Sequence, residues 1–182
     1  MVTAVTGGIA EGKSTVLDYL AELGFRTASA DSVARTVFED PTVNALLAGA
    51  VDQKGPISPI ELRSALFGNP DLRRLVNRIM HPRIIDLIRR SAADFVEIPL
   101  LIETCLQGEF DSVWVVTCGL GEQKRRLVAR YGNTVDVDVL IAAQLPTEVK
   151  IAFADEVFRT NCDFQTVRRN VSEALQRRFE LG

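Results

Sequence analysis

One segment near the N-terminus restricts the fold more than any other part of the chain. Residues 7–15 read Gly-Gly-Ile-Ala-Glu-Gly-Lys-Ser-Thr and match the pattern G-x-x-x-x-G-K-[S/T]. The β-rich run of residues 1–6 predicts a strand before this segment, and the apolar spacing of residues 13–23 predicts a helix after it. In such a position, successive backbone N–H groups and the positive end of the helix dipole can surround a phosphate. The sequence therefore predicts a phosphate-binding loop.

The loop also carries side chains suited to nucleotide chemistry. Lys13 would reach the β- and γ-phosphates, and the Ser14 hydroxyl would ligate Mg²⁺. The alternative, a tight glycine-rich turn with an exposed lysine, is disfavoured by the position of the motif directly after a strand. The motif alone does not separate a kinase from a GTPase, an ATPase motor or a switch. The predicted ATP-binding residues are Gly8, Ile9, Ala10, Glu11, Gly12, Lys13, Ser14 and Thr15.

The order of the predicted elements indicates an α/β fold. The first helix ends at Gly24 and residues 25–28 read as a second strand, and strand, helix and strand in succession imply a parallel sheet. Apolar runs at residues 95–101 and 112–117 predict further buried parallel strands, and a last short strand is expected at residues 156–158. With 182 residues, of which 47% are hydrophobic, the chain can bury one full core.

A long helical insertion separates the second strand from the third. From Asp31 to about Arg90 the pattern is almost wholly helical. Between Arg63 and Arg90, seven arginines stand against two acidic residues, so this stretch carries +5 while the rest of the chain carries −8. An anionic partner could bind there. Short breaks are expected at Pro41, residues 55–59, residues 68–70 and His81-Pro82.

Charge and cysteine pattern argue against several classes of protein. A formal charge of −3 argues against a general nucleic-acid or membrane-surface binder, because both use a basic excess. Cys105, Cys118 and Cys162 show no C-x-x-C spacing, which suits reduced thiols better than a disulfide framework or a zinc site. No run is long enough to span a membrane, and no export signal is recognisable. We expect a cytoplasmic protein without nucleic-acid or membrane partners; its oligomeric state is not indicated.

Asp31 is the candidate general base. It follows the second predicted strand, and ligands of open parallel sheets bind outside the carboxyl ends of the strands. A kinase acting on an alcohol needs a carboxylate there to accept or orient the hydroxyl proton. The alternative is that Asp31 caps the helix expected to start at Ser32. Its position alone favours neither interpretation.

Two arginines and the single histidine are further candidates. Arg126 and Arg130 are four residues apart on a predicted helix, so they project from one face and could neutralise a transferring phosphate. The alternative is a solvated basic face. His81 precedes Pro82, which would suit the first position of a helix, so a structural histidine at a helix start is the alternative to a ligand contact.

Several separated motifs together resemble the dephospho-coenzyme A kinase family along nearly the whole chain. Residues 6–15 look like that family's phosphate loop, and Ala30-Asp31 followed by Ala34-Arg35 resembles its substrate motif. His81-Pro82 and residues 99–103, Pro-Leu-Leu-Ile-Glu, are similar to two further signatures. The later residues that follow in the family's order are Arg126, Arg130, Gln144, Lys150 and Ala154-Asp155.

The resemblance implies a P-loop NTPase fold in three parts. A three-layer α/β/α core around a five-stranded parallel sheet would bind ATP, beside a helical substrate domain and a helical lid. The implied activity is transfer of the ATP γ-phosphate, with Mg²⁺, to the ribose 3′-hydroxyl of dephospho-coenzyme A in the last step of coenzyme A biosynthesis. The implied ranges are 1–31, 93–118 and 153–182 for the core, 32–92 for the substrate domain and 119–152 for the lid.

The resemblance also implies roles for individual residues. Asp31 would act as the base, and the two lid arginines would close over the phosphates together with the loop lysine. The implied catalytic residues are Asp31, Lys13, Arg126 and Arg130. The implied substrate-binding residues are Asp31, Arg35, His81, Leu100 and Glu103.

The chain departs from the family pattern in four places, two of which are Ser58-Pro59, where an Asp-Arg pair is common, and Thr160-Asn161, where the usual asparagine position is matched only to within one residue. Ala10-Glu11 stands where the family usually has Gly-Ser, which would place a carboxylate near bound phosphate unless Glu11 turns to solvent. Ser29 stands where many members have an additional acid. Two alternatives therefore remain open: a nucleoside or nucleotide kinase of the same core fold, and a non-catalytic ATP-binding regulator.

Overall fold

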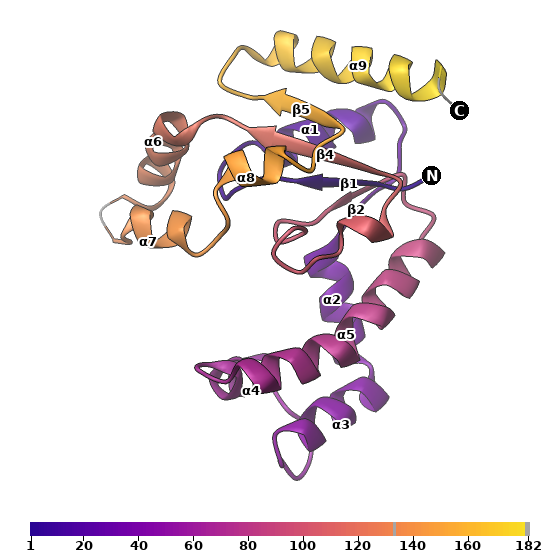
Figure 1. Cartoon of the computed structure of the whole chain (residues 1–182), viewed down its shortest axis with the longest axis vertical. Helices are drawn as coiled ribbons and strands as arrows, with labels where there is room; N and C mark the ends of the chain where they lie inside the picture. The colour runs from indigo at the N-terminus through magenta and orange to yellow at the C-terminus, as the bar shows by residue number, and fades with distance from the viewer. Residues whose placement is uncertain (133, 181–182) are drawn as a thin grey trace. The chain divides into compact units, whose positions relative to one another are not determined.

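The computed structural model divides into two compact units, and its helices and strands are labelled in Figure 1. It describes residues 1–132 and 134–180; residues 133, 181 and 182, which the predicted lid and core ranges include, lie outside the described residues. The first unit comprises residues 1–27 and 93–182, and the second comprises residues 28–92. The division into core, substrate domain and lid remains a prediction.

The sheet has five strands in the order β2-β3-β1-β4-β5. β1 pairs in parallel with β3 and with β4, and β4 pairs in parallel with β5. The predicted five-stranded α/β fold is therefore confirmed. The strands are β1 (Thr3–Thr6), β2 (Thr27–Ser29), β3 (Phe95–Glu97), β4 (Ser112–Thr117) and β5 (Glu156–Arg159).

The core of the first unit lies where two helices pack on one face of the sheet. α1 (Lys13–Glu22) and α9 (Phe164–Glu180) contribute apolar side chains that pack with those of β1, β3, β4 and β5. Trp114 lies at its centre, with ring centroids 4.9 Å from Phe95 and 4.8 Å from Phe158. This core fixes the carboxyl end of β1, from which the phosphate loop emerges.

The chain between β3 and β5 supplies the remaining helices of the first unit. A short 3-10 turn, Gln107–Glu109, precedes β4. Three helices then separate β4 from β5: α6 (Leu120–Tyr131), α7 (Val137–Ala142) and α8 (Thr147–Ile151). α8 packs against β4 and contains Lys150, which is fully buried. Among the described helices, none has the length and apolar character needed to cross a membrane.

The second unit is helical and has its own apolar core. Its helices are α2 (Ala30–Glu39), α3 (Pro41–Ala50), α4 (Pro59–Leu66) and α5 (Pro70–Arg90). Local signals start three of them: Asp40 and Asn69 accept hydrogen bonds from N–H groups of the next turn, and Ser58 forms a capping box with Glu61. Val37, Leu47 and Val76 are buried among the residues that hold these helices together.

The predicted break at His81-Pro82 is wrong. α5 continues through Pro82 to Arg90, although a proline inside a helix removes one hydrogen bond and costs about 3 kcal/mol. Buried residues on both sides of Pro82, namely Val76, Ile85 and Ile88, hold the two halves in one helix. His81 therefore lies within α5, and its interpretation as a structural histidine at a helix start is also wrong.

The alternative that Asp31 caps a helix starting at Ser32 is wrong as well. α2 begins at Ala30, and Ser29 is the residue at its N-cap. Asp31 is the second residue of the helix, where a carboxylate is favoured by the helix dipole without acting as a cap.

Candidate active site

The phosphate loop follows β1 and depends on glycines for its shape. Gly12 has φ of 95°, and a Cβ there would lie 2.7 Å from Thr160 Oγ1. A Cβ on Gly7 would lie 2.2 Å from the Val116 carbonyl oxygen. Ala10 adopts φ of 60°, a left-handed conformation that costs an L-residue about 1–2 kcal/mol. The loop therefore packs closely against β4 and the residue after β5, and it contains one residue in a strained backbone conformation.

Lys13 occupies the first position of α1, and its side chain is buried within the loop. Its Nζ donates to the Gly8 carbonyl oxygen at 3.0 Å and lies 3.9 Å from Glu97 Oε1. Ser14 is exposed at the start of the same helix, and Thr15 follows it half-buried. The ammonium group and the hydroxyl thus lie at a helix N-terminus, where anions bind favourably.

Glu11 does not turn to solvent, so this alternative for its side chain is wrong. It is only 1% exposed. Its carboxylate accepts hydrogen bonds from the Gly8 N–H at 2.6 Å, the Thr117 hydroxyl at 3.0 Å and the Thr147 hydroxyl. Three donors compensate the burial of the carboxylate.

Two glutamines hold the other side of the loop. Gln123 of α6 donates to the Ile9 carbonyl oxygen, and Gln144 Oε1 accepts from the Ile9 N–H, both at 2.9 Å. Sequence reasoning missed Gln123. Its spacing could have revealed it, because it lies four residues before the buried Leu127 on the apolar face of α6, where an unpartnered carboxamide would be costly.

Arg126 and Arg130 have different surroundings. The Arg126 guanidinium donates to the Thr160 carbonyl oxygen at 2.5 Å, to the Ala10 carbonyl oxygen at 3.4 Å and to Glu122 at 2.8 Å. Hydrogen bonds from Arg125 and Arg126 lower the pKa of Glu122 to about 2. Arg130 is exposed, and its guanidinium carbon lies 5.6 Å from the centroid of the Tyr131 ring. Arg126 therefore braces the loop, whereas Arg130 points to solvent.

The fully buried Lys150 pairs with the half-buried Glu103. Lys150 Nζ lies 2.8 Å from Glu103 Oε1 and donates to the Pro99 carbonyl oxygen at 2.7 Å. The Leu145 N–H donates to the same carboxylate at 2.9 Å. Burial alone would raise the pKa of Glu103, but the hydrogen bonds from Lys150 and Leu145 lower it below its usual value. Leu100, which precedes the pair in sequence, is 42% exposed.

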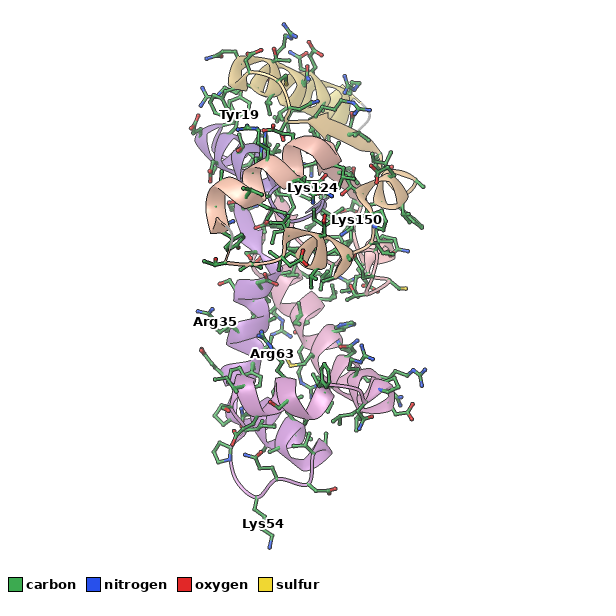
Figure 2. The ribbon with its side chains drawn as sticks, turned by 90° about the vertical axis from the view of Figure 1, so that its left-hand side faces the viewer. Tyr19, Arg35, Lys54, Arg63, Lys124 and Lys150 are labelled. Carbon is green, nitrogen blue, oxygen red and sulfur yellow. The ribbon has the colours of Figure 1, made fainter. Side chains whose placement is uncertain are left out.

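The other predicted substrate residues belong to the second unit. Asp31 and Arg35 are both exposed on α2, and Arg35 is marked in Figure 2. His81 is half-buried on α5, and burial lowers its pKa. The seven arginines between positions 63 and 90 are all exposed. This unit therefore displays a basic surface.

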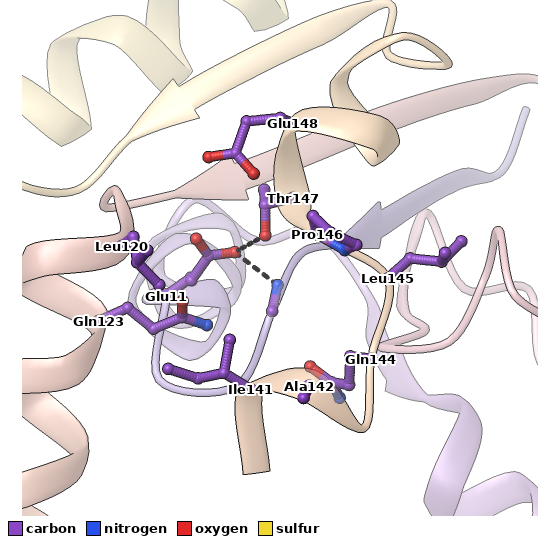
Figure 3. Close-up of a pocket in the computed structure, with 11 residues that line it drawn as sticks. Glu11, Leu120, Gln123, Ile141, Ala142, Gln144, Leu145, Pro146, Thr147 and Glu148 are labelled. Carbon is purple, nitrogen blue, oxygen red and sulfur yellow. Dashed lines mark hydrogen bonds between the residues drawn. The ribbon is translucent and has the colours of Figure 1, made fainter. Parts of the chain in front are cut away.

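A cavity of about 280 Å³ lies beside the phosphate loop (Figure 3). The loop contributes Gly8 and Glu11 to its wall. Of the other described loop residues, Lys13 and Ser14 do not line this cavity. α6 contributes Leu120 and Gln123, and residues 141–148 form the remaining wall. Glu11 points from the loop toward Thr147 across one side of this cavity.

Comparison with known proteins identifies the family. A model of the family described as dephospho-CoA kinase matches residues 1–165. The dephospho-CoA kinase of Carboxydothermus hydrogenoformans is 32% identical over 192 residues, which cover 97% of this chain and 93% of the relative. That of Escherichia coli O6:H1 is 33% identical over 173 residues, covering 88% and 84%.

A solved structure gives independent support for the fold. TT1252 from Thermus thermophilus superposes with a TM-score of 0.80 at 24% identity, covering 97% of each chain. At that identity the likeness concerns the fold alone. The sequence matches carry the assignment further: this chain belongs to the dephospho-CoA kinase family, whose members are ATP-dependent phosphotransferases.

Proposed function

We propose that this chain transfers the γ-phosphate of ATP to the ribose 3′-hydroxyl of dephospho-coenzyme A. The observation that carries the proposal is the placement of Lys13, whose Nζ lies 3.0 Å from the Gly8 carbonyl oxygen and 3.9 Å from Glu97 at the start of α1. This placement supports binding of the β- and γ-phosphates by residues 8–15. The family assignment supports the choice of acceptor.

The residues near Lys13 fit a magnesium ion. Mg²⁺ prefers oxygen ligands and usually takes one or two from the protein, with the rest from phosphate and water. The exposed Ser14 hydroxyl and the half-buried Glu97 carboxylate are oxygen donors of this kind beside the loop. Ser14 would hold the ion directly and Glu97 through water. When bound, Mg²⁺ neutralises charge on the phosphates.

Asp31 would act on the acceptor. Its carboxylate takes the proton of the 3′-hydroxyl as the oxygen attacks the γ-phosphorus, and the bond to the β–γ bridging oxygen breaks to release ADP. The position of Asp31 just after β2 supports this role, because ligands bind beyond the carboxyl ends of parallel strands. Arg35, His81 and Leu100 would contact the substrate.

The flanking segments would position the two substrates. The helical domain of residues 32–92 would hold the coenzyme A portion, since its exposed arginines suit a pyrophosphate. The segment 119–152 would act as the lid, with Arg126 and Arg130 stabilising charge on the transferring phosphate and Glu103 contacting the substrate at the base of the lid. We also propose that the protein works in the cytoplasm, which suits three free cysteines.

The test is ADP release from ATP and Mg²⁺ with dephospho-coenzyme A, adenosine or a nucleoside monophosphate as acceptor. Turnover with dephospho-coenzyme A alone is the expected result. Turnover with a nucleoside or nucleotide instead would replace the proposed acceptor and leave the role of the loop intact. ATP binding without turnover on any acceptor would overturn the proposal in favour of a non-catalytic regulator.

A further inference from the structure

The carboxylate of Glu11 connects three separate parts of the first unit. It accepts hydrogen bonds from Gly8 in the phosphate loop, from Thr117 at the end of β4 and from Thr147 at the start of α8. The Glu11 backbone is held as well, because the Thr160 hydroxyl donates to its carbonyl oxygen at 2.7 Å. One residue thus joins the loop, the sheet and α8, and Figure 3 shows its hydrogen bond to Thr147.

Burial makes these hydrogen bonds important for the loop. A buried carboxylate costs several kcal/mol unless hydrogen bonds or a cation compensate it. Within residues 1–132 and 134–180, Glu11 forms no ion pair with a lysine or arginine, so the three donors carry this compensation. Loss of one donor would leave a buried oxygen less well satisfied and would shift the loop.

The close approach of Glu11 to the loop is built into the backbone. A Cβ on Gly8 would lie 2.9 Å from Glu11 Oε2 and 2.7 Å from Gln123 Nε2, so a larger residue there would displace the ends of these two side chains. The next N–H of the loop, that of Ile9, is bound by Gln144. Side chains of the chain itself therefore hold the first two N–H groups after Gly7, while the end of the loop at Lys13 and Ser14 lies at the N-terminus of α1.

Two contacts to this first half of the loop come from one short segment. Gln144 binds Ile9 and Thr147 binds Glu11, and three residues further on Lys150 is fixed by Glu103 and Pro99. A displacement of residues 144–150 would consequently disturb the Gly8 and Ile9 N–H groups together.

We propose that Glu11 is a positioning residue that couples the phosphate loop to residues 144–150 through Thr147. In this arrangement α8 holds the loop in the conformation that binds the nucleotide phosphates, and a change at Thr147 alters the affinity for ATP through the position of the loop. The inference rests on the proposed function only in taking ATP as the ligand of the loop.

The experiment measures the Kd for ATP and Mg²⁺ by titration calorimetry at 20 °C and the melting temperature of each variant without nucleotide. The central variant is Thr147→Val, which keeps the shape of the side chain and removes the hydroxyl. Thr147→Ser retains the hydroxyl, and Thr27→Val removes a hydroxyl from an exposed threonine of β2 as the matched control. Glu11→Gln, alone and combined with Thr147→Val, completes a double-mutant cycle.

We expect Thr147→Val to raise the Kd for ATP about 10-fold, since it removes a hydrogen bond to a charged group. Thr147→Ser and Thr27→Val should stay within about 2-fold of the parent chain. The effect of Thr147→Val should be clearly smaller in the Glu11→Gln background, because the hydroxyl then donates to a neutral amide oxygen instead of a carboxylate.

Two outcomes would overturn the coupling. A lower melting temperature of Thr147→Val with an unchanged Kd for ATP would make the contact purely structural. If Thr147→Val raised the Kd for ATP by the same factor in the parent chain and in the Glu11→Gln variant, Thr147 would act without Glu11. Neither readout uses the acceptor, so failure of the dephospho-coenzyme A assay would not affect this test.

Discussion

The two units of this protein hold their charged side chains in different ways. The first unit buries three charged side chains and binds each of them internally. Lys13 and Glu11 form hydrogen bonds to Gly8 of the loop, and Lys150 pairs with Glu103. In the second unit, Asp31 and Arg35 are exposed, and so are all seven arginines between positions 63 and 90. The first unit thus fixes these charged groups through contacts within itself, whereas the second presents its charged groups at the surface.

Removal of the buried cation should have the largest effect. We expect Lys13→Met to lower kcat/KM about 10³-fold, because it removes a fixed charge from the transferring phosphate. Initial rates of ADP formation would measure this. Arg169→Met, on the exposed surface of α9, should stay close to the parent rate. A loss smaller than about 10-fold for Lys13→Met would contradict this role of the lysine.

A substitution of the exposed Asp31 tests the second unit. Asp31→Asn should lower kcat about 10²-fold while leaving the Kd for ATP unchanged, as expected for loss of a general base that does not hold the nucleotide. Single-turnover kinetics and ATP titration together separate the two quantities. Unchanged turnover would remove Asp31 from the catalytic role.

Arg126 and Arg130 of α6 should differ in their contribution to stability. Arg126→Gln should lower the free energy of unfolding by about 1–3 kcal/mol, because Thr160 and the loop lose a charged donor. Arg130→Gln should change stability by less than about 0.5 kcal/mol, as most exposed substitutions do. Urea unfolding measures both. If Arg130→Gln were the more destabilising change, the assignment of Arg126 as the brace would be wrong.

Relief of backbone strain in the loop should have a smaller and opposite effect. Ala10 has φ of 60°, which glycine adopts without a steric cost. Ala10→Gly should therefore stabilise the first unit by up to about 1 kcal/mol, after the greater flexibility of glycine in the unfolded chain is subtracted. The midpoint of urea unfolding would report it. Destabilisation instead would mean that Ala10 makes packing contacts worth more than its strain.

The smallest expected effect concerns pH and the second unit. Burial lowers the pKa of His81, so the unfolded chain binds a proton where the folded chain does not. Stability should therefore fall as the pH drops from about 6.5 toward the lowered value, and His81→Gln should remove that part of the slope. Unfolding curves between pH 5 and about 7.5 would show it. If the stability of His81→Gln depended on pH as that of the parent chain does, a group other than His81 would cause this dependence.

The sequence predicted the first unit better than the second, for physical reasons. β4 was expected at residues 112–117 and spans Ser112–Thr117, because a buried central strand is apolar along its length. In α5, the local signal of Pro82 was overridden by apolar packing on both sides. β2 begins two residues later than the predicted strand, as expected for a short edge element with a weak pattern.

The site could be predicted in its residue types but not in its contacts. The motif identifies Lys13 and Ser14 because the spacing itself encodes a loop before a helix. The direction of Glu11 could not be predicted, since its partners Thr117 and Thr147 lie more than 100 residues away in the sequence. Such long-range hydrogen bonds leave no periodic signal that a reading of one sequence can use.

The aromatic stack beneath the sheet has a consequence for spectroscopy. Trp114 is the only tryptophan of the chain, and it is buried between Phe95 and Phe158 in the first unit. The second unit, residues 28–92, contains neither tryptophan nor tyrosine. Intrinsic fluorescence therefore reports the melting of the first unit alone, while far-ultraviolet circular dichroism also follows the helices of the second. Together the two signals can reveal whether the units unfold together or in sequence.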